Sequence, residues 1–130
     1  MNDISDIQIE FNQTLFDLAS QLKTLCPYSF VAKNLSVLEI LLKTEPSKVI
    51  DLFTLRALKY KNQFDSGNDS FFLNGNFSAD VDGDSAIVGK IFELKESWKS
   101  LSNDNRNIVR QYLKYLFDLS DEYCVKISPQ

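Results

Sequence analysis

Three aspartates at alternate positions, Asp80, Asp82 and Asp84, are the residues of this chain best spaced to do chemistry. A calcium ion takes six to eight oxygen ligands, and alternate carboxylates on a tightly turning segment can supply several of them. Calcium is therefore the one cofactor that the sequence suggests, with these three aspartates as its metal ligands.

The segment around these aspartates resembles the opening of a calcium-binding loop of the EF-hand or dockerin type. The three carboxylates would stand at positions one, three and five of such a loop, and Ile87 would match the apolar eighth position. Ser85, however, replaces the usual glycine, Ile91 replaces the closing carboxylate, and Glu93 comes two residues too late. We therefore favour a solvated turn whose aspartates cap the following helix.

A group of large apolar residues lies just before these aspartates. It consists of Phe71, Phe72, Leu73 and Phe77. One interpretation is an exposed apolar anchor for a protein partner, held in an acidic frame. The other is that the loop folds back and fills one end of a helical bundle with these rings. We favour the second, because adjacent exposed apolar side chains promote aggregation.

Cationic residues gather near the C-terminal half and could form a nucleic-acid surface. They are Lys90, Lys95, Lys99, Arg106, Arg110 and Lys114. Tyr112 and Tyr115 lie close by, but Glu93, Glu96 and Asp104 interleave with the cations. The pattern is more typical of a solvated helix face with ion pairs one turn apart.

Composition narrows the functional classes. The chain has 130 residues, 14 Lys and Arg, 18 Asp and Glu, and a net charge of -4, which disfavours general nucleic-acid binding. Histidine is absent, and so are a Gly-rich phosphate loop and any paired acid and base, so we expect no enzyme and no small-molecule substrate. The acidic start carries no secretory signal, and no apolar run approaches a membrane span. Cys26 and Cys124 are too few for a disulfide scaffold, so we expect free thiols in an intracellular protein.

Apolar residues recur every three or four positions along most of the chain, which predicts an all-α fold in one domain over residues 1–130. We expect a bundle of five amphipathic helices, at about 3–25, 29–42, 45–63, 85–100 and 103–119. An acidic loop over 65–84 separates the third helix from the fourth. It holds five aspartates and no base, which leaves 13 acids and 14 bases elsewhere.

Three finer expectations follow from the apolar pattern. Val37 and Ile40 widen the apolar stripe of the helix at 29–42, so we expect that helix near the centre of the bundle. Trp98 continues a helical stripe and should be a core residue. Beyond residue 119, the alternation of Tyr123, Val125 and Ile127 allows a short extended segment.

The order of these signals resembles that of small acidic helical proteins encoded by giant nucleocytoplasmic DNA viruses. The resemblance is carried by Pro27, Glu45-Pro46, Lys59-Tyr60-Lys61, Asp69-Ser70-Phe71-Phe72-Leu73, Lys95-Glu96-Ser97-Trp98-Lys99-Ser100-Leu101, Ile108 and Tyr112-Leu113. It implies a viral protein located in the host cytoplasm or the virion, and it transfers no catalytic residues.

The sequence therefore favours a non-enzymatic interaction or structural protein, either a minor virion component or a viral factor that binds another protein through Phe71, Phe72, Leu73 and Phe77. One alternative is a calcium-binding helical domain that uses the acidic loop. The other is a small nucleic-acid-associated factor that uses the cationic side of the last two helices.

Overall fold

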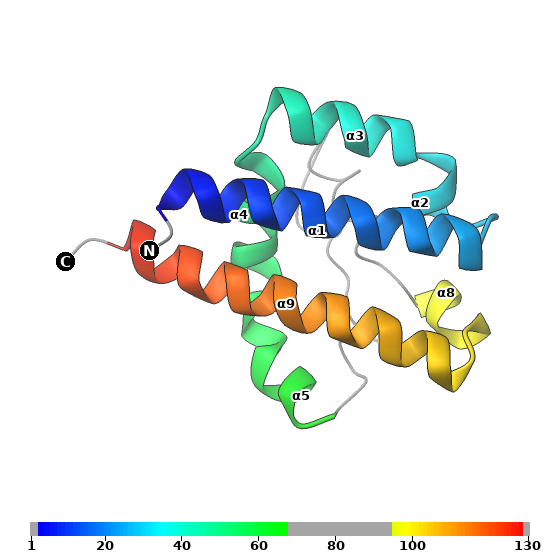
Figure 1. The fold of residues 1–130 in the computed structure, drawn as a ribbon. Coiled ribbons are helices and arrows are strands. Elements are labelled where there is room, and N and C mark those ends of the chain that lie inside the picture. Colours follow the sequence, from blue (N-terminus) through cyan, green and yellow to red (C-terminus); the bar gives the residue numbers. More distant parts are fainter. Residues whose placement is uncertain (1–2, 68–94, 129–130) are drawn as a thin grey trace.

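The computed structural model describes residues 3–67 and 95–128, and every regular element among them is a helix (Figure 1). The all-α prediction is therefore confirmed. In chain order the elements are α1 (Ile4–Leu25), α2 (Phe30–Lys33), α3 (Leu35–Thr44), α4 (Lys48–Arg56), η1 (Leu58–Tyr60), α5 (Lys61–Asp65), α8 (Lys95–Ser100) and α9 (Asn103–Ile127).

Local capping explains where the first helices begin and end. The Asp3 carboxylate accepts a hydrogen bond from the Asp6 amide at 2.9 Å and caps α1, which ends two residues before Pro27. Ser29 caps α2 by accepting from the Ala32 amide at 3.1 Å. At Asn34 the backbone leaves helical geometry, so the helix expected over 29–42 is divided into α2 and α3.

The helix expected over 45–63 is also divided. The regular helix α4 begins at Lys48, after Pro46, and gives way to the 3₁₀ turn η1 and the short α5. The Lys61 ammonium anchors α5, because its Nζ lies 2.8 Å from the Asp65 carboxylate and 3.8 Å from that of Asp118 in α9. The hydrogen bond to Asp65 outweighs the effect of burial and raises the pKa of Lys61.

The last helix is longer than the sequence indicated. Ser102 caps α9 by accepting from the Asn105 amide at 3.2 Å, and the helix continues to Ile127, past the expected end near residue 119. The extended segment suggested for the tail is wrong. Helical geometry buries Tyr123 to 4% exposure and leaves Val125 at 65%, because these residues lie on opposite sides of a helix.

The central element is α1. It lies between α3 on one side and α9 on the other, with α4 crossing behind them (Figure 1). The pairing of α1 with the antiparallel α9 is the most extensive in the described part of the chain. We expected a central place for the helix at 29–42, and that expectation is wrong: Val37 is 43% exposed and Ile40 is 62% exposed on the outer side of α3.

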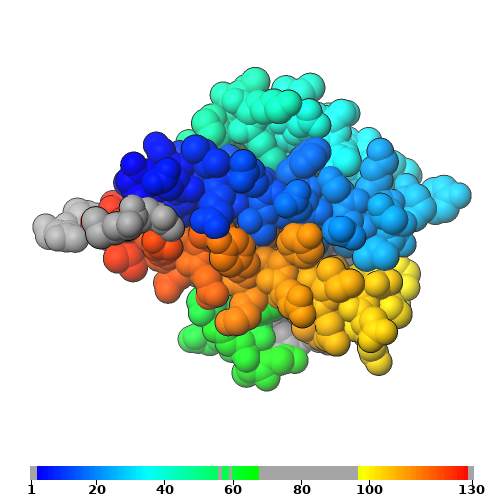
Figure 2. All heavy atoms as spheres, in the orientation of Figure 1, coloured from blue at the N-terminus to red at the C-terminus, as the bar shows by residue number. Residues whose placement is uncertain are grey.

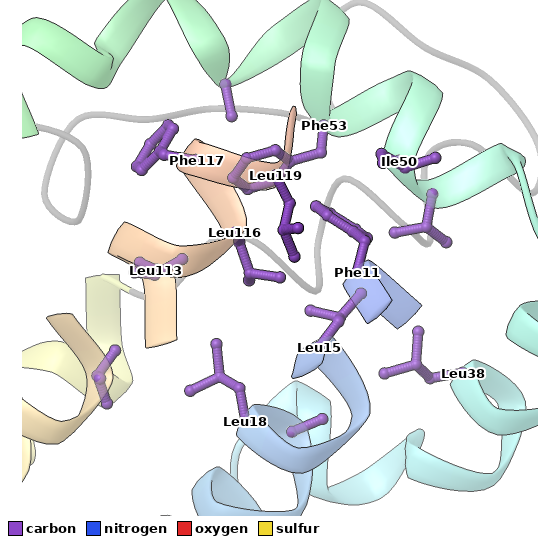
Figure 3. Close-up of a cluster of buried hydrophobic side chains, with 14 of the residues drawn as sticks. Phe11, Leu15, Leu18, Leu38, Ile50, Phe53, Leu113, Leu116, Phe117 and Leu119 are labelled. Carbon is purple, nitrogen blue, oxygen red and sulfur yellow. The ribbon is translucent and has the colours of Figure 1, made fainter. Parts of the chain in front are cut away.

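A chain of aromatic rings joins the helices in the core. Phe11 of α1 contacts Phe53 of α4 with ring centroids 5.3 Å apart, and Phe53 contacts Phe117 of α9 at 5.2 Å (Figure 3). The ring centroid of Phe117 in turn lies 5.0 Å from that of Phe64 in α5. Such tilted and edge-to-face contacts add stability beyond the burial of apolar area. Trp98 is 1% exposed, which confirms it as a core residue.

One polar network crosses the same core. Tyr123 of α9 donates a hydrogen bond to the Asp51 carboxylate of α4 at 2.5 Å, and Gln8 of α1 donates to the Tyr123 hydroxyl at 3.5 Å. Burial and the bond to Asp51 raise the pKa of Tyr123, while the bond from Gln8 acts in the opposite direction. The network therefore ties α1, α4 and α9 together as long as the phenol stays protonated.

Replacing Phe53 with Ala should reduce the free energy of unfolding by about 3–5 kcal/mol, because a ring that joins two aromatic contacts leaves a cavity. The matched control is Leu55→Ala in the same helix, whose side chain is 69% exposed. That change should stay within about 0.5 kcal/mol. Urea unfolding followed by circular dichroism measures both, and equal losses for the two variants would contradict this core.

Tyr123→Phe should cost about 1 kcal/mol at neutral pH, since the Asp51 carboxylate loses a hydrogen bond. The raised pKa of Tyr123 in the native state means that its contribution is complete below pH 10, the ordinary value. It is lost as the pH rises through the native pKa, because the unfolded chain ionises first. The alkaline loss of stability should therefore be shallower in Tyr123→Phe. Tyr28→Phe, at an 87% exposed position, should leave the profile unchanged.

Candidate functional site

A groove of about 600 Å³ lies between α1 and the corner that joins α3 to α4. Its apolar wall is formed by Ile9 and Phe16 of α1 together with Leu42 and Pro46. Ile9 is 55% exposed, so a large aliphatic side chain of α1 faces solvent at this groove. The groove is therefore an apolar depression that solvent reaches.

Asn12 fixes the shape of this groove. Its Nδ2 donates a hydrogen bond to the Pro46 carbonyl at 2.9 Å, which holds the α3–α4 corner against α1. The side chain is 9% exposed, and its Oδ1 has no hydrogen-bond partner among the described residues. A buried acceptor without a partner is costly, so Asn12 serves to position the corner at some expense in stability.

A second groove, of about 490 Å³, follows the opposite side of α1, where α9 packs against it. Its α9 wall consists of Ile108, Gln111, Tyr112 and Tyr115, none of which is an Asp, Glu, Lys or Arg. Ile108 is 39% exposed and Tyr115 is 42% exposed. Thus two partly apolar depressions flank one helix.

Asp17 lines both grooves. It belongs to an exposed row along α1, the outer strip, which consists of Asp6, Ile9, Gln13 and Asp17. Figure 2 shows α1 as an exposed band between α3 and α9. Across the first groove, Lys43 pairs with Glu39 at 2.9 Å. Of the described residues that line the two grooves, Asp17 alone carries a charge without an ion pair.

Tyr115, which lines the second groove, donates a hydrogen bond from its hydroxyl to the Glu10 carboxylate of α1. That bond, with partial burial and the nearby charge of Glu122, raises the pKa of Tyr115. The phenol is neutral at physiological pH and stays paired with Glu10.

The residues that the sequence proposed for a partner or a metal lie outside the described residues. These are Phe71, Phe72, Leu73 and Phe77 for a partner, and Asp80, Asp82 and Asp84 for calcium. Both assignments stay predictions. Within residues 3–67 and 95–128, no three acidic or cysteine side chains gather in a group that could hold a metal ion.

The proposed cationic surface is only partly described. Lys90 lies outside the described residues, Lys99 is exposed, and Lys114 lies 3.9 Å from Asp118. Arg106 and Arg110 instead pack over the Trp98 ring, with guanidinium carbons 5.2 and 4.9 Å from its centroid.

Arg106 also donates a hydrogen bond from Nε to the Trp98 carbonyl at 3.0 Å, so it fixes the junction of α8 and α9.

Cys26 and Cys124 are free thiols, as the sequence predicted.

Sequence reasoning missed the grooves. The apolar pattern of the first helix predicted no role for Ile9, Phe16 or Asp17. A signal was present, because Ile9 and Phe16 fall outside the main apolar stripe of that helix. Nothing in the sequence alone indicated which neighbouring helices would flank them.

No protein-family model, curated protein or solved structure matches this chain. Among the described residues, no helix combines the length and the apolar character needed to cross a membrane.

Glu10→Ala should lower the pKa of Tyr115 toward its ordinary value of about 10, because it removes the accepting carboxylate. The pKa of Tyr123, which is raised by burial and by the hydrogen bond to Asp51, should remain raised. Titration followed by carbon-13 NMR of the tyrosine ring carbons resolves the two residues. An unchanged Tyr115 titration would show that the contact with Glu10 does not persist in solution.

Proposed function

We propose that this chain is a non-enzymatic interaction protein that binds another protein through the grooves on either side of α1. The observation that carries the proposal is the pair of depressions that share Asp17 and expose Ile9 and Ile108. Two grooves that run beside one helix suit an elongated segment with several side chains better than a compact metabolite. Peptide segments bind such grooves by inserting apolar anchors spaced along their length.

The construction of the grooves supports binding with little rearrangement. Asn12 holds the α3–α4 corner, and the contact between Tyr115 and Glu10 holds α9 against α1. Walls that are already positioned reduce the conformational entropy lost on association. The resemblance to proteins of giant DNA viruses would make the partner a virion or host-cell protein.

The test is selection of binders from a random peptide library displayed on phage, with the folded full chain as bait. Methyl NMR should then show peptide-induced shifts at Ile9 and Ile108. The double variant Ile9→Ser/Ile108→Ser should weaken peptide binding at least about tenfold, because about 1.4 kcal/mol of apolar contact is lost. Leu55→Ser is the matched control, since Leu55 is exposed and lines neither groove.

A separate variant, Phe71→Ser/Phe72→Ser, tests the surface that the sequence proposed. Binding that is lost in this variant and retained in Ile9→Ser/Ile108→Ser would move the interaction site to the aromatic segment. Binding that is equally sensitive to Leu55→Ser would contradict a specific site in the grooves.

A further inference from the structure

We propose that the partner presents a basic amphipathic segment, with a Lys or Arg that pairs with Asp17 and large apolar side chains that enter the two grooves. This inference rests on the proposed function, because it names the chemistry of the partner at the same surface. It follows from the one carboxylate that both grooves share.

Covering the Asp17 carboxylate with a ligand costs binding free energy. Because its side chain lines both grooves, a segment that fills either one removes water from the carboxylate. Desolvating an unpaired charge opposes binding unless the partner brings an opposite charge with good geometry. An apolar segment alone would therefore bind poorly here.

Among the described residues that line the two grooves, none is a base left free to pair with Asp17. Lys43 is the one base among the described residues that line the first groove, and it pairs with Glu39 at 2.9 Å. The α9 wall of the second groove is uncharged. The positive charge must therefore come from the partner.

Carboxylates along and beside the outer strip favour a basic ligand. Asp6 lies on the strip with Asp17, and Glu10 lies beside it as the acceptor for Tyr115. The one base of α1, Lys23, is in its last turn. A like-charged ligand, such as a nucleic acid, an anionic membrane or the same face of a second copy, would be repelled, whereas a basic segment would be attracted.

The experiment uses the peptides selected on the full chain. Enriched sequences should contain Lys or Arg beside Leu, Ile, Phe or Trp, more often than the unselected library does. Asp17→Asn should weaken their binding about tenfold, as the loss of a close interfacial charge pair does. Asp121→Asn, at an exposed carboxylate of α9 that lines neither groove, should leave binding unchanged. Binding to the wild-type chain should also weaken in 0.5 M salt.

A charge exchange makes the test specific. Asp17→Lys should abolish binding of the basic peptide, and a peptide whose cationic residue is replaced by Glu should recover much of it. Thermal unfolding of each variant shows whether the chain remains folded, and Asp17 is exposed, so these variants should melt like the wild type.

The outcomes separate this inference from the proposed function. Peptides that depend on Ile9 and Ile108 but are neither basic nor sensitive to Asp17→Asn would overturn the inference and leave the proposed function standing. Absence of any peptide that depends on Ile9 and Ile108 would overturn both.

Discussion

The packing of α1 against its neighbours is the constraint on which the rest of the described structure depends. Phe11 begins the series of ring contacts that continues through Phe53 and Phe117, so one side chain of α1 orders helices distant in sequence. Burying each large apolar side chain contributes roughly 1.5–3 kcal/mol, which must offset the conformational entropy of the chain. Short helices such as α2 and α5 are too short to be stable alone, so they form because α1 and α9 provide surfaces to pack on.

A helix that packs on three sides leaves a narrow part of its surface exposed. On α1 that part is the outer strip, and the grooves form where the strip meets α3 on one side and α9 on the other. Their existence follows from the same packing that stabilises the core. The grooves should therefore be as rigid as the helices that form their walls, because Asn12 and Tyr115 link those helices across them.

The sequence predicted the helical class and most of the core, because a periodicity of three to four residues directly reports an amphipathic helix. The apolar spacing of the first helix predicts one stripe, which consists of Ile4, Ile7, Phe11, Leu15, Leu18, Leu22 and Leu25. The five middle residues are buried, whereas Ile4 is 38% exposed and Leu25 is only partly buried.

It failed where tertiary context decides. The apolar Val37 and Ile40 indicated a central helix, yet α3 lies at the edge, since periodicity shows how wide a stripe is and not which part of it is covered. The end of α9 was placed too early for a similar reason. Tyr123 and Asp51 are 72 residues apart in the sequence, so no local pattern could reveal the contact between them.

The distribution of charge over the surface also depends on the tertiary structure, and it matters for function. Outside the acidic loop, 13 acids and 14 bases nearly cancel, so the sequence predicts a nearly neutral helical body. Folding distributes these charges unevenly. The bases Arg106 and Arg110 pack over the Trp98 ring, and Lys61 pairs with carboxylates of α5 and α9. Asp17, in contrast, has no ion pair among the described residues and lies beside two grooves. Local potential depends on which charges are already neutralised by neighbours, and near neutrality of the sum is therefore compatible with an acidic face on α1.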